Sequence, residues 1–512
     1  MEEDDAGRAM LEYHEATKHS FDSVYRRQHH LDWDIMPRPF KVYPELEPLP
    51  LPRDFTSSTR PALAVIADPG ASAGDGSVLD RRRLAHLLYF TAGVLRRRTF
   101  PGGEVFFRAA ACTGALHHVD LYVACADLPD LEAGLYHFGP HDFALRLLRR
   151  GDHRAVLVDA TAGEEAVRAA PVVIACATTF WRNAWKYRDR AYRHVFWDGG
   201  TLLANLLAVA AAHQLPTRVI HAFVDRTVDE LLDLDRTREA SFALVALGRG
   251  ASAPLPSPAI RPLGLATLPL SSREVDYPII RAAHLASSFT RPEEAARWRS
   301  AAPPATRALP PAAVPLPPVD SEHAVPEPIE TVILRRGSAR SFPPDAIDAR
   351  ELATLLWCST RGIPTDRRAD GSLVTPFVIV RAVRDVAPGT YAYDRARHAL
   401  VALQSGEFAR DAGHLALGQS LGAEAAVCVY WLADLGAVTA ALGSRGYRAV
   451  SLEAAIEGGK AYLAAYALGL GATGLTFFDD DVIRFSSPLA AGDGVMFLVA
   501  CGRRPRPGAR RQ

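Results

Sequence analysis

The sequence predicts an α+β fold made of two tandem copies of one unit, because three landmarks recur at a single spacing. A Gly-x-Tyr-x-(Phe/Tyr) segment occurs at 134–138 and again at 389–393, an offset of 255 residues (389 minus 134). The same offset relates two Arg-x-Tyr-Arg segments and two Phe-x-Asp segments. These further pairs are 190–193 with 445–448, and 223–225 with 478–480. Repetition at a fixed spacing is the signature of a duplicated structural unit.

The composition is that of a globular protein. The 512 residues include 58 basic and 58 acidic side chains, for a formal net charge of +0, and 48% of them are hydrophobic. At about 150 residues per domain, this length accommodates several domains. A balanced charge creates no uniform field that would draw the protein to nucleic acid or to an acidic membrane. We therefore expect no nucleic-acid partner.

The cysteines and the N-terminal segment indicate a cytoplasmic location. The six cysteines lie far apart and form no C-x-x-C pair, which argues against a disulfide framework and a structural zinc site. The start, MEEDDAGRAM, is acidic where a secretory signal needs a basic region. The longest apolar run, near 202–212, is far shorter than the roughly 20 residues of a membrane-spanning helix. We expect no membrane partner and no metal.

The first half of the chain divides into an arm and a unit. Residues 1–60 are polar and then Pro-rich, as in an arm that packs over the body. The first unit, 61–250, contains an Ala/Leu-rich stretch at 197–215 that is typical of a buried helix. It closes with an apolar run at 241–248, which has the length of a central strand.

The second half repeats this order after a linker. Residues 251–328 are expected to form a helical appendage and a Pro-rich linker, because nine of the 37 prolines fall in 301–328 and favour extended backbone. The second unit, 329–512, has its own Ala/Leu-rich helix at 452–470 and its own apolar strand at 495–502.

A cluster of guanidinium groups opens the second unit. Arg335, Arg336 and Arg340 lie within six residues, with the hydroxyl of Ser338 between them. Planar guanidinium forks and hydroxyls suit a phosphate monoester. The alternative is a solvated basic loop without a ligand.

Glycines follow the predicted helix of the second unit. Residues 468–478 contain three of them, which would let backbone N–H groups approach a flat ligand. The alternative is a helix C-cap and a tight turn.

The first unit offers a different candidate, the adjacent pair Lys186 and Tyr187 among several arginines. A lysine or tyrosine becomes a useful acid or base when neighbouring positive charge or burial lowers its pKa. We expect Arg190 and Arg193 to lower both pKa values. The alternative is the exposed start of an amphipathic helix. The segment 111–114, before a predicted strand, is either a ligand-facing loop or a turn.

Taken together, these segments resemble the flavin-dependent nitroreductase superfamily and, within it, the SagB-type dehydrogenases that oxidise azolines in peptides. The resemblance covers about residues 10–504 as two tandem nitroreductase-like domains, and residues 13–20 resemble the leader of SagB-type proteins. It implies FMN as the cofactor. Family members are implied to be intertwined homodimers with FMN at the interface, so the tandem chain is expected to form an internal pseudo-dimer.

The resemblance also implies which residues contact FMN. The family's Arg-Arg-Ser-x-Arg element for the phosphate is similar to Arg335, Arg336, Ser338 and Arg340, with Gly337 inserted. The family's Gly-rich run beside the flavin ring is similar to 469–478 and supplies Gly474, Leu475, Thr476 and Phe477. Its Pro-Ser-x-Gly loop resembles 111–114, with Thr113 and Gly114 retained and the proline and serine lost. Its acid/base pair falls on Lys186 and Tyr187.

The two copies depart from the family in complementary ways. The second copy has Ala441 and Leu442 where the first has Lys186 and Tyr187, and the first copy lacks the arginine cluster. In place of Gly-Leu-Gly, the first copy has residues 214–216, Gln-Leu-Pro. One surviving site is therefore expected, with one FMN per chain.

Three functions remain open. The first is a SagB-type dehydrogenase that oxidises azolines in a peptide or small molecule by hydride transfer to flavin N5, with Lys186 and Tyr187 taking the proton. The second is a nitro or quinone reductase that uses NAD(P)H and needs no dedicated base. The third is a flavin-free pseudo-enzyme that binds a peptide or partner. Further oligomerisation of the tandem chain is also left open.

Overall fold

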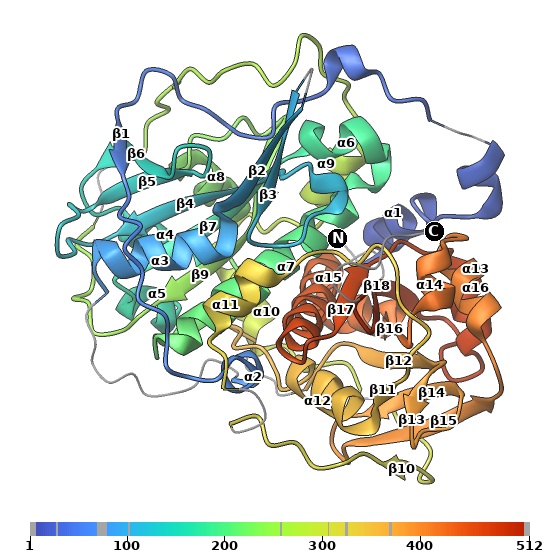
Figure 1. Cartoon of the computed structure of the whole chain (residues 1–512). Helices are drawn as coiled ribbons and strands as arrows, with labels where there is room; N and C mark the ends of the chain where they lie inside the picture. Colours follow the sequence, from blue (N-terminus) through green and yellow to red (C-terminus); the bar gives the residue numbers. More distant parts are fainter. Residues whose placement is uncertain are drawn as a thin grey trace.

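The computed structural model describes residues 7–26, 29–68, 79–100, 103–256, 259–305, 307–322, 326–367 and 371–505. It contains two seven-stranded antiparallel sheets, one in each half of the chain, with long helices between them (Figure 1). The strand orders are β1-β6-β5-β4-β7-β9-β8 and β10-β15-β14-β12-β16-β18-β17. The sheets therefore repeat one topology, and the predicted tandem α+β fold is confirmed.

Both sheets are built from apolar strands that helices cover. The first comprises β1 (Pro48–Pro50), β4 (Val119–Cys125), β5 (Gly134–Gly139), β6 (Ala144–Arg150), β7 (Val172–Thr179), β8 (Thr217–Ile220) and β9 (Glu239–Leu247). The second comprises β10 (Val314–Pro315), β12 (Thr375–Val380), β14 (Gly389–Asp394), β15 (Ala399–Ser405), β16 (Val427–Ala433), β17 (Gly471–Gly474) and β18 (Gly494–Gly502). In each sheet, β1 or β10 extends the edge from outside the unit expected from the sequence, because the arm and the linker each contribute one strand.

Two buried helices form the centre of the molecule, α7 (Ala191–Ala212) and α15 (Leu435–Ala467) (Figure 1). They cross closely at small residues. A Cβ added to Gly200 would lie 2.4 Å from the Cβ of Ala455, and one added to Gly459 would lie 2.6 Å from the Cβ of Ala204. Residues 200 and 455 differ by the repeat offset, as do 204 and 459, so the pseudo-twofold axis passes through this crossing.

One helical run of the described residues, from α6 (Phe180–Tyr187) through α7, is long and apolar enough to cross a membrane. The apolar 18-residue window within this run is entirely buried inside the protein. It is therefore read as core.

The remaining helices occur mostly as pairs, one in each half. The pairs are α1 (Arg8–Ala16) with α9 (Pro278–Ala286), α2 (Ala62–Ala67) with α11 (Ile329–Arg335), α3 (Arg81–Ala92) with α12 (Ala349–Ser359), α4 (Arg154–Ala160) with α13 (Ala409–Leu415), α5 (Glu165–Ala169) with α14 (Ser420–Glu424), and α8 (Asp225–Leu231) with α16 (Asp479–Ser486). Three further features have no such partner among the described residues: α10 (Pro292–Ser300), the hairpin of β2 (Val94–Phe100) with β3 (Gly103–Arg108), and the short parallel pair of β11 (Ile347–Asp348) with β13 (Val383–Arg384).

Two buried ion-pair networks join the halves. In one, Asp479 of the second half lies 3.1 Å from Arg190 and 2.6 Å from Arg193 of the first half. Burial alone would raise the pKa of Asp479, but the two guanidinium groups hold it well below its usual range. Each end of this network is nearly inaccessible to solvent. Such pairs are strongly destabilising to break, because one charge is left buried and alone.

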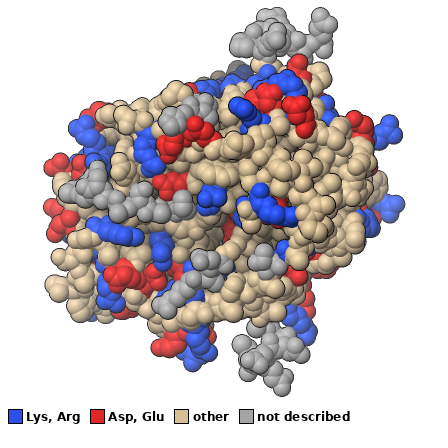
Figure 2. All heavy atoms as spheres, turned by 90° about the horizontal axis from the view of Figure 1, so that it is seen from below, with Lys and Arg blue, Asp and Glu red and all other residues tan. Residues whose placement is uncertain are grey.

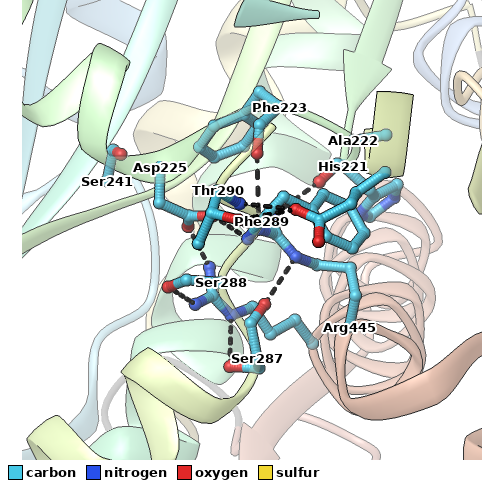
Figure 3. Close-up of polar contacts among 12 residues, drawn as sticks. His221, Ala222, Phe223, Asp225, Ser241, Ser287, Ser288, Phe289, Thr290 and Arg445 are labelled. Atoms are coloured by element: carbon cyan, nitrogen blue, oxygen red, sulfur yellow. Dashed lines mark hydrogen bonds and ion pairs between the residues drawn. The ribbon is translucent and has the colours of Figure 1, made fainter. Parts of the chain in front are cut away.

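The counterpart network reverses the roles of the halves. Asp225 of the first half pairs with Arg445 and Arg448 of the second, and Figure 3 shows Arg445 reaching toward Asp225 and the backbone around His221. Since α8 begins at Asp225 and α16 at Asp479, the structural offset at this point is 254. The sequence alignment of Asp225 with Asp480 was wrong by one residue.

The segment expected as an appendage contains the second half's equivalent of α1. Arg193 donates to the His14 carbonyl and to Thr17 Oγ1, and Arg448 donates in the same way to the carbonyl of His284 and to Ser287 Oγ. The N-terminal arm, through α1, and the segment 251–328, through α9, therefore bind to equivalent arginines in the two halves of the core.

Candidate functional site

The arginine cluster lies on the turn that follows α11, at the seam between the two halves. Arg336 donates to the backbone carbonyls of Arg108 and Ala109 in the first half, at 3.2 and 3.1 Å. The N–H of Ala339 donates to the carbonyl of Ala472 at 2.9 Å, which attaches the turn to β17. The turn thus contacts both the first half and the Gly-rich segment of the second.

The four predicted phosphate ligands differ in their surroundings. Arg335 pairs with Glu327 at 2.5 Å and donates to the carbonyl of Tyr466. Ser338 Oγ lies 3.4 Å from the hydroxyl of Tyr462 and is exposed, as is Arg340. Arg335 therefore holds the turn in place, while Ser338 and Arg340 face outward.

Arg336 is the unusual member of the cluster. It is partly buried, and among the described residues no carboxylate forms an ion pair with it. Burial lowers the pKa of its guanidinium group. A guanidinium that has only carbonyl partners retains unneutralised positive charge, and an anionic ligand would provide the missing charge.

The Gly-rich segment presents polar groups that lack partners. The hydroxyl of Thr476 is buried without a hydrogen bond, and the backbone N–H groups of Thr476 and Phe477 have no acceptor among the described residues. The N–H of Gly474 donates to the hydroxyl of Tyr462. Buried polar groups are nearly always paired in proteins, so these donors indicate a ligand with acceptor atoms.

The loop of the first half is held rigidly by an acid from α7. The N–H and the hydroxyl of Thr113 donate to Asp198 Oδ1 at 2.8 and 2.7 Å. His118 Nε2 lies 2.9 Å from the other oxygen of Asp198. Burial and the neighbouring Asp198 raise the pKa of the Cys112 thiol well above its usual range, so this cysteine is not a thiolate nucleophile.

The predicted acid/base pair lies against this loop. Gly114 has φ +61°, and a Cβ added there would lie 2.8 Å from Tyr187 Oη and 3.5 Å from Lys186 Cδ. Lys186 is exposed and Tyr187 is half-buried. A glycine is required at position 114 both by its left-handed backbone and by this close approach.

The expected lowering of the Tyr187 pKa by two arginines was wrong. Arg190 and Arg193 turn to Asp479 instead, and burial together with Asp198 raises the pKa of Tyr187. Tyr187 is consequently a neutral phenol at physiological pH, which can donate a proton and is a poor base.

Aromatic rings connect this pair to the second half. Tyr187 packs edge-on against His194 with ring centroids 4.4 Å apart, and His194 lies 4.9 Å from the ring of Trp197. Trp197 in turn lies 5.6 Å from Phe477. The structure therefore brings all the predicted site residues to one seam, which we call the open seam, although they come from both halves of the chain.

The opposite seam, which we call the closed seam, is filled by protein. The N–H of Val219 on β8 donates to the carbonyl of Pro364 at 2.8 Å, and the N–H of Asp366 donates back to Val219 at 3.0 Å. The carboxylate of Asp366 accepts the N–H groups of His221 and Ala222 at 2.9 and 3.0 Å. Because β8 and β17, like α8 and α16, are offset by 254 residues, these two residues correspond to Leu475 and Thr476 in the open seam.

Residues of the open seam fit FMN, since the phosphate needs a cation and the flavin ring has acceptor atoms along one edge. Arg336 supplies the first requirement, and the unpartnered donors of Thr476 and Phe477 supply the second. On the face of the molecule shown in Figure 2, basic and acidic side chains are interspersed.

Sequence reasoning missed several residues of the two seams: Asp198, His118, Tyr462 and Asp366. Asp198 carried a usable signal, because it is an acid in an apolar helix and has Glu453 at the repeat offset. The other three become meaningful only once the chain is folded.

Comparison with known proteins gives two kinds of likeness. A model of the nitroreductase family matches residues 103–249 and 333–503, more than half of the chain. A protein of Methanocaldococcus jannaschii that is assigned as a nitroreductase is 30% identical over 162 residues, which cover 30% of this chain and 82% of that protein.

A crystal structure from Anabaena variabilis, also assigned as a nitroreductase, covers 97% of this chain and 99% of its own. Its TM-score is 0.75 and its sequence identity is 24%, so this likeness concerns the fold. The tandem architecture is thus shared over the whole length.

Proposed function

The chain belongs to the nitroreductase family, and from this premise we propose that it is an FMN-dependent oxidoreductase with one flavin site, at the open seam. The observation that carries the proposal is that one seam holds both Arg336, a guanidinium without a carboxylate partner among the described residues, and the buried, unpaired hydroxyl of Thr476. Together they suit a phosphorylated ligand that has acceptor atoms.

Each residue of the open seam has a separate role in this proposal. Arg336 and Ser338 hold the phosphate, and Arg335 positions their turn through Glu327. The N–H groups of Thr476 and Phe477 bind the edge of the flavin ring. Bound FMN supplies hydride transfer, while the protein fixes geometry and handles protons.

Lys186 and Tyr187 manage protons at the mouth of the site. Both lie against Gly114 in the loop of the first half, and Lys186 Nζ lies 5.5 Å from the ring centre of Tyr187. In a SagB-type reaction, Lys186 takes the proton from the azoline carbon and Tyr187 positions the substrate. The substrate class is a peptide or small-molecule azoline.

A second candidate is a nitro or quinone reductase that uses NAD(P)H. The raised pKa of Tyr187 favours it, because a neutral phenol donates a proton to a reduced product more readily than it removes one from a substrate. In that case Tyr187 contributes more than Lys186.

The first experiment measures flavin in the purified protein. We expect a yellow protein that releases one FMN per chain on denaturation. Arg336→Gln should lower FMN affinity by roughly tenfold to a hundredfold, because hydrogen bonds to charged groups are worth about 1.5–3 kcal/mol. The exposed Arg226→Gln serves as the matched control. A colourless protein that takes up no added FMN would establish the flavin-free pseudo-enzyme instead.

The second experiment separates the two enzyme functions. Lys186→Ala should abolish azoline oxidation with FMN still bound, while Tyr187→Phe should mainly slow reduction of nitroaromatics or quinones by NAD(P)H. Azoline turnover that is unchanged in Lys186→Ala would remove the dehydrogenase mechanism.

A further inference from the structure

Three side chains with metal-ligating atoms converge beneath the arginine turn, outside the flavin site. They are His86 on α3, His213 directly after α7, and Glu330 on α11. One ligand atom from each lies within 4.8 Å of those of the other two. Two of these residues come from the first half of the chain and one from the second.

Polar atoms of all three side chains are buried without hydrogen bonds. These atoms are His86 Nε2, His213 Nε2 and Glu330 Oε2. His86 is 4% exposed and Glu330 is 2% exposed. Burying unpaired polar groups is costly, so a cluster of three requires an explanation.

The shortest contact in the cluster is not a hydrogen bond. His86 Nε2 lies 3.1 Å from Glu330 Oε1, yet Nε2 lacks an aligned acceptor. Two ligands of a tetrahedral zinc ion, each about 2.0–2.1 Å from the metal, are about 3.3 Å apart. The separation of these two atoms therefore fits neighbouring metal ligands.

We infer that His86, His213 and Glu330 form a binding site for one divalent transition-metal ion, with Zn²⁺ the expected occupant. Two imidazole nitrogens and one carboxylate oxygen are a recurrent ligand set for Zn²⁺, with a water completing the coordination. The ion would join α3 and α7 of the first half to α11 of the second.

The surroundings support metal binding. The rings of His86 and His213 pack edge-to-face with their centroids 4.4 Å apart, which keeps both imidazoles close to the carboxylate of Glu330. The N–H of Ser58 donates to Glu330 Oε1 at 3.2 Å and orients that carboxylate, as outer hydrogen bonds do at metal sites. His213 is only half-buried, which provides an entry path for the ion.

The competing arrangement is a direct contact between His86 and Glu330 that needs no metal. The two possibilities differ in what the purified full-length protein binds, and this difference does not depend on flavin or on turnover.

The test measures metal content and metal binding directly. After a chelator has removed any bound metal and Zn²⁺ has been added back, elemental analysis should find one Zn²⁺ per chain. With Co²⁺ in place of Zn²⁺, the protein should show the visible absorption of a four-coordinate site at wavelengths beyond the flavin bands. His213→Ala should weaken Zn²⁺ binding by at least on the order of tenfold. Because His213 is half-buried, this variant retains its fold, which circular dichroism verifies.

Two further variants make the result decisive. His414→Ala removes an exposed histidine that pairs with Asp481 and should leave Zn²⁺ binding unchanged, which controls for surface binding. Glu330→Gln keeps the shape of the side chain and should also weaken binding. Failure of the wild-type protein to bind Zn²⁺, or equal binding by His213→Ala, would overturn the inference in favour of a direct contact between His86 and Glu330 without a metal.

Discussion

The open and closed seams began as equivalent places in a duplicated fold, and they now differ in what fills them. At the open seam, Arg336 has only carbonyl partners and the hydroxyl of Thr476 has no hydrogen-bond partner among the described residues. At the closed seam, a loop of the second half adds to β8, and Asp366 accepts two N–H groups, of which that of Ala222 is equivalent to the N–H of Thr476. Two halves on one chain can diverge in this way, whereas identical subunits must change both sites together.

The closed seam lacks the first arginine of the cluster. Pro61 and Pro328 face each other in an isolated bridge, and seven residues after each come Asp68 and Arg335. The aspartate therefore occupies the position of that arginine, and it pairs with Arg60 at 3.3 Å. This position holds a neutralised ion pair at the closed seam.

The largest expected effect tests whether the halves are equivalent at the core. Asp479→Asn and Asp225→Asn should each lower the free energy of unfolding by about 3–5 kcal/mol, because each leaves two buried arginines without a carboxylate. Urea denaturation measures both. Since Asp479 follows the Gly-rich segment directly, only Asp479→Asn should also weaken FMN binding. Equal loss of FMN in both variants would show that the seams are not distinct.

A smaller effect concerns the closed seam alone. Asp366→Ala leaves two buried N–H groups without an acceptor and should lower the free energy of unfolding by about 1–3 kcal/mol. The FMN content should remain one per chain, because the seam lacks an arginine cluster. The exposed Asp345→Ala is the control. A second FMN in Asp366→Ala would mean that the carboxylate alone excludes the cofactor.

The same residue predicts a pH dependence. Burial raises the pKa of Asp366 to about 6 in the folded protein, whereas an unfolded aspartate titrates near pH 3.9, roughly two units lower. The folded state then binds more protons between these values, so this group's contribution to stability falls as pH rises from about 4 to about 6. The stability difference between the wild type and Asp366→Ala should change across that window. A difference that is constant from pH 4 to 7 would contradict the assignment.

The smallest expected effect compares the loop of Thr113 at the open seam with the loop of Ser372 at the closed seam. Thr113→Val removes one hydroxyl bond to Asp198, and Ser372→Ala removes the corresponding bond to Glu453 in the closed seam. Each should cost about 1 kcal/mol of unfolding free energy. Only Thr113→Val should weaken FMN binding, by several-fold, as measured by flavin fluorescence titration. Similar FMN affinities in both variants would argue against a role for the first loop.

The repeat and the fold could be predicted from sequence because identical residues recur at one offset. Arg336, Thr476 and the Lys186–Tyr187 pair were expected at a site, and they lie at one seam. Arg190 and Arg193 were misjudged, since their partner Asp479 is far away in the sequence. That partner was predictable in principle, because the arginines and the aspartate all recur near the same offset.

The remaining features depend on contacts between distant segments. Asp366 lies in a loop with no motif, and its importance appears only when that loop docks on β8. His86, His213 and Glu330 come from three separate helices, so no ligand spacing is visible in the chain. Sequence spacing reveals sites built within one element, and these sites are built between elements.

The crossing of α7 and α15 has a consequence for assembly. On a true twofold axis each residue meets its own copy, but here Gly200 meets Ala455 and Ala204 meets Gly459, so a protrusion on one helix fills a hollow on the other. Two copies of the N-terminal half, expressed alone, would leave a gap at position 200, and two copies of the C-terminal half would collide at position 455. The halves are therefore matched to each other and poorly matched to themselves, which disfavours exchange between chains.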